Sequence, residues 1–328
     1  MMSRHLVLPL CGVFVALIGW LQFSPLTAQE NPDGKSPNAT GAASGTYRLA
    51  YKYQAGDSVG YETVHKVKFI SQFKGTEEVA TNCTETKKRY KVVRVHPNGN
   101  AELQLIIDWV RMKVNFGGDD PGTEFDSKDT GARSQQKFEN IYKIIGKPQA
   151  TLLCAPNGKV LKFVQEKATP DSIGKGEVQL KDISAQDEFS FLTIFPDAPI
   201  KVGDTWSEKS DTKVVVDEKL KQTIELKRTY KLESVDGNRA AISFKTAILT
   251  PFNNPSISIQ LIQRETSGRL VFDMERGTVV SRTVDTDKTL IKPVGDNTAM
   301  RATSHLLERL LTQTAEVTDA PPEAVQKK

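Results

Sequence analysis

Residues 223–248, TIELKRTYKLESVDGNRAAISFKTAI, decide the fold class of this 328-residue chain. Apolar side chains alternate with polar ones on both sides of Asp236-Gly237-Asn238: Ile224, Leu226, Tyr230 and Leu232 before the turn, and Ala240, Ile242, Phe244 and Ile248 after it. A period of two is what a half-buried strand requires. An Asp-Gly pair between two such runs is a strong hairpin signal. The stretch therefore predicts two antiparallel strands joined by a tight turn.

The same order of strands and turns occurs earlier in the chain. Residues 90–105, YKVVRVHPNGNAELQL, repeat the hairpin pattern around a second glycine turn. Each copy is preceded by a Gly-Asp pair (Gly56-Asp57 and Gly203-Asp204) and followed by a further glycine turn (Gly158 and Gly277). Such self-similarity indicates one strand plan used twice. We expect repeat unit one at about 47–165 and repeat unit two at about 199–291.

The two units differ in length at one place. Gly99 and Gly158 are 59 positions apart, whereas Gly237 and Gly277 are 40 apart, so unit one carries 19 extra residues there. We attribute them to a loop and a helix over 134–145, whose apolar stripe comprises Phe138, Ile141, Tyr142 and Ile145. This helix is expected in unit one alone, where it would line or cover a groove.

Three further segments complete the expected fold. A capping serine and a following proline predict a linking helix over 184–194. Alternating residues predict a strand at 257–261. Residues 304–313 fit either a helix, which we favour, or the return strand of a hairpin. The fold class is therefore mainly β: a curved antiparallel sheet or half-barrel built from two related units, with two or three helices.

The N-terminus has the order of a secretory signal. Arg4 and His5 precede an apolar run that ends near Ala28, which predicts a cleaved signal peptide at 1–28. An uncleaved membrane anchor is the alternative. Residues 29–46 are small, polar and rich in Gly and Pro, as a flexible tether would be. A single β-rich domain then spans 47–313, and 314–328 form a disordered tail. The expected location is periplasmic or extracellular, with no transmembrane span after cleavage.

Charge and cysteine content narrow the functions further. Loss of Arg4 leaves 43 basic against 40 acidic residues, interspersed along the chain, which argues against nucleic-acid binding. Two cysteines remain after signal removal, Cys83 and Cys154. Export permits a disulfide between them, and two buried free thiols are the alternative.

Catalytic and metal-binding patterns are weak. His65, His96 and His305 are far apart, and no Cys-x-x-Cys or paired-histidine spacing indicates zinc. No Gly-x-Ser-x-Gly motif marks a hydrolytic nucleophile. The acidic residues between Asp119 and Asp129 do not follow the spacing of a calcium loop, since Lys128 stands among them. We therefore expect no metal, no cofactor and no catalytic residues.

Two motifs resemble a family of exported bacterial β-rich proteins of unknown function. They are residues 195–206, FPDAPIKVGDTW, and residues 268–279, which contain GRLVFD and GTV. In that family a Gly-Asp strand opening recurs twice, and the resemblance covers roughly 47–291. It implies an architecture and an exported location, and no functional residues. A looser likeness, of architecture only, is to the half-barrels of periplasmic lipoprotein carriers.

These observations favour a non-enzymatic envelope protein. The expected partner is a lipid or other apolar ligand, or an envelope protein, held on the curved sheet. A structural or adhesive scaffold is the first alternative, and a hydrolase with an unrecognised site is the second.

Overall fold

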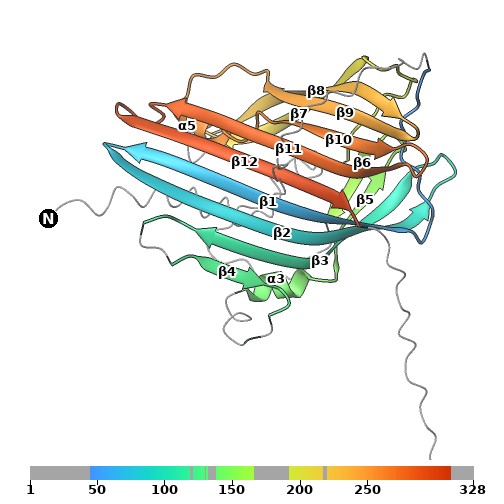
Figure 1. The fold of residues 1–328 in the computed structure, drawn as a ribbon, viewed down its shortest axis with the longest axis horizontal. Coiled ribbons are helices and arrows are strands. Elements are labelled where there is room, and N and C mark those ends of the chain that lie inside the picture. Colours follow the sequence, from blue (N-terminus) through green and yellow to red (C-terminus); the bar gives the residue numbers. More distant parts are fainter. Residues whose placement is uncertain are drawn as a thin grey trace, which may run out of the picture.

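A computed structural model describes residues 45–118, 121–129, 131, 138–165, 192–216 and 220–311 (Figure 1). The mainly β class is confirmed. The described elements are β1 (Ser58–Phe73), β2 (Thr76–Val95), β3 (Ala101–Asn115), β4 (Thr123–Asp126), α3 (Glu139–Ile144), β5 (Pro148–Cys154), β6 (Val160–Gln165), β7 (Thr205–Val215), β8 (Lys221–Asp236), β9 (Arg239–Ile248), α5 (Pro255–Gln260), β10 (Ser267–Asp273), β11 (Thr278–Ile291) and β12 (Thr298–Leu310). The expected signal peptide 1–28, most of the tether 29–46 and the tail 314–328 lie outside the described residues.

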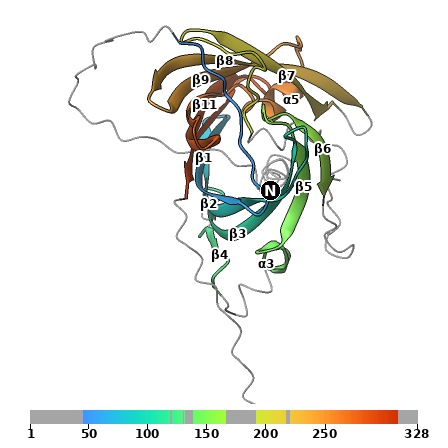
Figure 2. The same cartoon turned by 90° about the vertical axis from the view of Figure 1, so that its right-hand side faces the viewer.

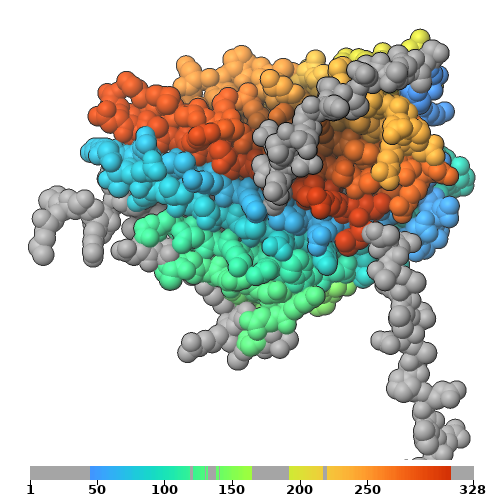
Figure 3. All heavy atoms as spheres, in the orientation of Figure 1, coloured from blue at the N-terminus to red at the C-terminus, as the bar shows by residue number. Residues whose placement is uncertain are grey.

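All twelve strands belong to one open antiparallel sheet. Its order is β6-β5-β3-β2-β1-β12-β11-β10-β9-β8-β7, with β4 beside β3. The sheet curls around an interior, with β6 and β7 as its two edges (Figure 2). Its convex face carries β11, β12, β1, β2 and β3 side by side (Figure 3).

The repeat holds at the level of single hydrogen bonds. Gly56 donates its backbone N–H to the carbonyl of Val92, over 2.9 Å, and Gly203 donates to Leu232 over 2.8 Å. Both glycines have positive φ, 92° and 94°. The ladder shifts register just after Val92 and just after Leu232. Unit one is thus the meander β1-β2-β3-β5-β6, unit two is β7 to β11, and β12 joins them by pairing with β11 and β1.

The helices differ from expectation. The predicted strand at 257–261 is the helix α5, because the Asn254 side chain accepts a hydrogen bond from the Ser256 N–H (2.9 Å) and Pro255 starts the first turn. Ile257 and Leu261 are then buried at helical spacing. Since α5 lies between the third and fourth strands of unit two, as α3 does in unit one, a helix here is not peculiar to unit one. Within the predicted helix 134–145, residues 139–144 form α3 and 134–137 lie outside the described residues.

Two further helix predictions also change. Residues 304–310 belong to the strand β12, so the preference for a helix was wrong. Adjacent leucines such as Leu306 and Leu307 face opposite sides of the sheet, and Glu308 returns to the buried side. Of the predicted helix 184–194, only 192–194 are described, and they are not helical.

The core lies on the concave face. Its largest cluster combines tyrosine and phenylalanine side chains from both units with the entry segments at 49–51 and 195–200. The described residues include no helix long and apolar enough to span a membrane.

Candidate functional site

The concave face contains charged side chains among its apolar ones. Lys88 on β2, Arg282 on β11 and Glu308 on β12 are all buried, Lys88 to 2% exposure. Strand parity places them there: Lys88 pairs with Tyr61, which is itself buried on β1, and Arg282 pairs with Glu308. The consecutive strands β11 and β12 and the distant strand β2 thereby bring two cations and one carboxylate together.

The three groups form a bridged ion-pair cluster. One carboxylate oxygen of Glu308 accepts a hydrogen bond from Lys88 Nζ at 2.7 Å, and the other accepts one from an Arg282 Nη at 2.8 Å. Burial alone would raise the pKa of Glu308, but the charges of Arg282 and Lys88 outweigh it and lower that pKa. Burial lowers the pKa of Lys88, against the charge of Glu308. The cluster therefore holds Glu308 ionised.

Tyrosines surround this cluster. The Tyr61 hydroxyl shares a 2.9 Å hydrogen bond with the Thr278 hydroxyl and donates to the Val279 carbonyl over 3.2 Å. Tyr90 meets the Tyr61 ring edge-on, with centroids 6.1 Å apart. The Tyr51 hydroxyl accepts the Thr193 N–H at 3.0 Å. Burial raises the pKa of Tyr51 and of Tyr61, so both phenols stay neutral hydrogen-bonding groups.

Within the described ranges, several buried hydroxyls near this cluster have no hydrogen-bond partner. They belong to Tyr53, Thr63 and Thr86. Thr63 and Thr86 are 1% and 0% exposed, and Thr63 pairs with Glu308 across the β1–β12 ladder. Buried polar groups are nearly always satisfied, so these three hydroxyls are exceptions.

A cavity of about 210 Å³ lies beside these groups. Residues of β1, β2 and β12 and the segment before β1 line it, among them Tyr51, Tyr53, Val59, Tyr61, Tyr90 and Glu308. Three exposed residues stand at the rim of the cavity, namely Lys52, Asp57 and Arg276. The inner lining combines aromatic and aliphatic side chains with polar groups, which are the Glu308 carboxylate, the tyrosine hydroxyls and the hydroxyls of Ser58 and Thr278.

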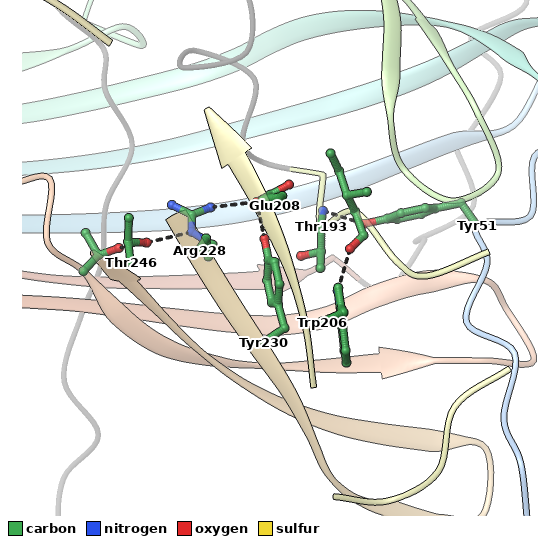
Figure 4. Close-up of polar contacts among 9 residues, drawn as sticks. Tyr51, Thr193, Trp206, Glu208, Arg228, Tyr230 and Thr246 are labelled. Carbon is green, nitrogen blue, oxygen red and sulfur yellow. Dashed lines mark hydrogen bonds and ion pairs between the residues drawn. The ribbon is translucent and has the colours of Figure 1, made fainter. Parts of the chain in front are cut away.

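In unit two an indole occupies the ladder position that Val59 occupies in unit one (Figure 4). In unit one, Val59 pairs with Tyr90; at the equivalent place in unit two, Trp206 pairs with Tyr230. The Trp206 indole stacks on Tyr230 at 5.3 Å between centroids, and its N–H donates to the Ile194 carbonyl at 2.8 Å. A valine therefore stands in unit one where unit two has an indole, and the cavity lies at that position.

The polar pair beside the indole is also satisfied internally. Tyr230 donates to Glu208 over 2.5 Å, and Arg228 contacts the same carboxylate at 3.8 Å and donates to the Thr246 hydroxyl at 2.9 Å (Figure 4). Glu208 and Arg228 occupy the ladder positions that Tyr61 and Lys88 occupy in unit one. Unit two therefore pairs its own charges, one cation to one carboxylate.

A larger depression, of about 1170 Å³, crosses the sheet near Lys66–Lys68 and Thr303–His305. Most of the residues that line it are of polar or charged types, and several of its charges pair with one another, as His305 does with Asp285 and Lys288 with Glu265. It is more open than the cavity beside Tyr61. We prefer the smaller cavity as the candidate site because buried side chains enclose it.

The cysteines named from the sequence do not meet. Both are free thiols, so the disulfide considered above is not formed. Cys83 pairs with Lys113 near one end of β3, and Cys154 pairs with Ala101 at the other. Twelve residues of strand separate those two partners, roughly 40 Å, whereas a disulfide needs Cα atoms within about 7 Å.

The helix residues proposed to form a groove or lid lie together. Phe138, Ile141, Tyr142 and Ile145 pack with Ile107, Val110 and Phe125 of β3 and β4. The ring centroids of Phe125 and Phe138 are 4.4 Å apart. None of the four lines the cavity beside Tyr61. Among the described residues no group of three or more histidine, cysteine, aspartate or glutamate side chains is arranged to hold a metal ion.

Sequence reasoning missed the charged cluster. The available signal was parity: Lys88 stands two residues before Tyr90 in one strand, and Glu308 stands between Leu306 and Leu310 in another. Arg228 likewise occupies the apolar side of the 224–232 alternation. A charge at an inward position of a half-buried strand indicates a buried partner or a site. Which charges would meet depended on strand order.

Comparison with known proteins gives little functional information. Residues 177–279 match a family of unknown function (DUF6263). No curated protein sequence matches the chain. Among solved structures, DynF from the dynemicin biosynthesis pathway of Micromonospora chersina is similar over 84% of this chain and 92% of its own, at 8% identity and a TM-score of 0.18. Pseudomonas aeruginosa OccK11 (OpdR) is similar over 81% and 99%, at 7% identity and a TM-score of 0.16. Neither TM-score is high enough to support an argument about fold or function.

Proposed function

We propose that this chain is an exported, non-enzymatic binding protein that holds an apolar or amphiphilic ligand in the cavity of unit one. The observation that carries the proposal is the difference between the repeat units. Trp206 packs on Tyr230 in unit two, whereas Val59 beside Tyr90 leaves space in unit one. Protein interiors are close-packed, so a cavity at the place where the other unit carries an indole suggests a use for it.

The lining suits such a ligand. Ligand sites combine an apolar wall with a few fixed polar groups, and here Val59 and the tyrosine rings provide the wall. The unpartnered Tyr53 hydroxyl provides a hydrogen-bonding group. At about 210 Å³ the cavity is narrow, which favours a single hydrocarbon chain over a bulky ring system.

The charged cluster supports binding over hydrolysis. A general acid or base needs a pKa near the working pH. The pKa of Glu308 is instead lowered, and both of its oxygens contact cations. The carboxylate is thus fixed as part of the floor of the cavity.

Filling the cavity tests the proposal. We expect Val59→Trp to place an indole against Tyr90, as Trp206 lies against Tyr230, and so to keep the fold while displacing ligand. Val93→Trp is the matched control, since Val93 is 47% exposed on β2 and outside the cavity. Native mass spectrometry of each protein, purified from its own envelope, would detect a retained small molecule.

The expected result is a bound mass on the wild type and on Val93→Trp, and none on Val59→Trp. Melting temperatures must confirm that Val59→Trp is folded. Equal retention by both variants would reject the cavity as the site. A folded wild type without bound mass, which also takes up no added amphiphile, would favour the scaffold alternative.

A further inference from the structure

The described residues around the cavity carry an excess of positive charge. At the rim stand Lys52, Arg276 and Asp57, and inside stands Glu308. Behind Glu308 lie Lys88 and Arg282. Four cations therefore accompany two carboxylates. In unit two the equivalent polar pair, Arg228 and Glu208, is balanced.

The two rim cations belong to adjacent segments. The Lys52 N–H donates to the Gly277 carbonyl at 3.2 Å, so the chain at 52 lies directly against the β10–β11 turn that bears Arg276. Lys52 Nζ donates to the Glu275 carbonyl at 2.9 Å. Within the described part of the chain, the Arg276 guanidinium makes no ion pair, and it is exposed at the opening. Its five N–H donors are available to an anion at this point.

We propose that the ligand is a single-chain amphiphile with an anionic head, a carboxylate or a phosphate, bound head-outward. This deepens the proposed function and rests on it. The chain enters among Val59 and the tyrosines, and the head lies at the rim against Arg276 and Lys52. A planar guanidinium binds such oxyanions in a forked geometry. A head at the rim also keeps contact with water, which avoids the cost of burying its charge.

Glu308 does not oppose this orientation. Its charge is compensated by Arg282 and Lys88 at 2.8 and 2.7 Å. Among the described residues that line the cavity, Asp57 is the one other carboxylate, and it stands with two cations. The summed field at the opening therefore attracts an anion and disfavours a cation.

Four ten-carbon probes separate the effect of the head from that of the chain. Decanoate, decyl phosphate, decanol and decyltrimethylammonium are titrated calorimetrically below their micelle concentrations. The proteins are the full chain, its Arg276→Gln variant, the matched control Arg269→Gln and the cavity-filling variant Val59→Trp. Arg269 is also exposed but lies outside the cavity lining.

We expect both anions to bind about tenfold or more tightly than decanol, and the cation to bind most weakly. Arg276→Gln should weaken the anions about threefold to tenfold, the range for a partly exposed charged contact. It should leave decanol unchanged, and Arg269→Gln should change nothing. Added salt should weaken binding of the anions alone. The anion that binds more tightly, decanoate or decyl phosphate, identifies the head group as a carboxylate or a phosphate.

Decanol binding as tightly as decanoate would overturn the head-group proposal, as would equal effects of the two arginine variants. If Val59→Trp abolished decanol binding in that case, the proposed function would stand although the head-group proposal had failed. Failure of all four probes to bind would reject both.

Discussion

Glu308 links the two repeat units at the scale of single residues. It lies on β12, the strand that joins the units, and contacts Lys88 from unit one and Arg282 from unit two. Removing the carboxylate and removing one cation have different effects on stability. Without the carboxylate, two buried like charges have no counter-charge, whereas without one cation a neutral ion pair remains.

We expect Glu308→Gln to lower the free energy of unfolding by about 3 kcal/mol or more, the scale for an uncompensated buried charge. Lys88→Met should cost less, about 1 kcal/mol, because the Glu308–Arg282 pair remains. Urea unfolding at pH 7 would measure both. The reverse order of the two costs would contradict the bridged arrangement.

The same residue predicts a pH dependence. Because the folded-state pKa of Glu308 is lowered, its ionised form stabilises the protein fully above the unfolded pKa, about 4.3. That contribution is lost as pH falls through the lower folded-state pKa. Between pH 5 and 3 the wild type should therefore lose more stability than Glu308→Gln. Parallel acid unfolding profiles for the two proteins would argue against this assignment.

At the scale of elements, the opening turn of each unit is the repeated device. Gly56 and Gly203 adopt positive φ, and a Cβ at either position would meet no atom within 4 Å. Any cost of a side chain there is conformational and involves no clash. The two turns also fix the register of β2 and β8 through the bonds to Val92 and Leu232.

We expect Gly56→Ala and Gly203→Ala each to destabilise the protein by about 1 kcal/mol, through the strain of positive φ. Because the two sites lie in different units, the double variant should cost about 2 kcal/mol. Thermal unfolding of the three variants would test this. A large cost at one glycine and none at the other would mean that the two turns are not equivalent.

The whole molecule is one sheet whose concave face encloses the core. Where the protein works depends on whether it is exported. Export remains a proposal and concerns a segment outside the described residues. The charged, apolar and small-residue order of 1–28 predicts cleavage after Ala28. N-terminal sequencing of the envelope-associated protein should therefore start at Gln29. A full-length chain that resists carbonate extraction would favour the membrane anchor instead.

The sequence alone determined the elements whose signals are local. Alternation of the kind seen from Ile224 to Leu232, and glycine turns such as Gly99 and Gly237, specify hairpins within a few residues, so the repeat and the mainly β class could be predicted. Local signals failed where two periods compete. The short apolar segments at 257–261 and 304–310 fit both strand and helix. At 257–261 the Asn254 cap and Pro255 favoured the helix, and at 304–310 pairing with β1 and β11 decided for the strand.

Only the tertiary structure decided the site. Arg282 and Glu308 pair across the consecutive strands β11 and β12, but Lys88 lies 194 and 220 positions from them, and nothing local to it specifies those partners. Their meeting depends on β12 inserting between β1 and β11, a long-range pairing that parity cannot reveal. The cavity likewise depends on which side chain, Val59 or Trp206, faces its paired tyrosine across the ladder. Strand order, and with it the site, results from burying the whole concave face at once.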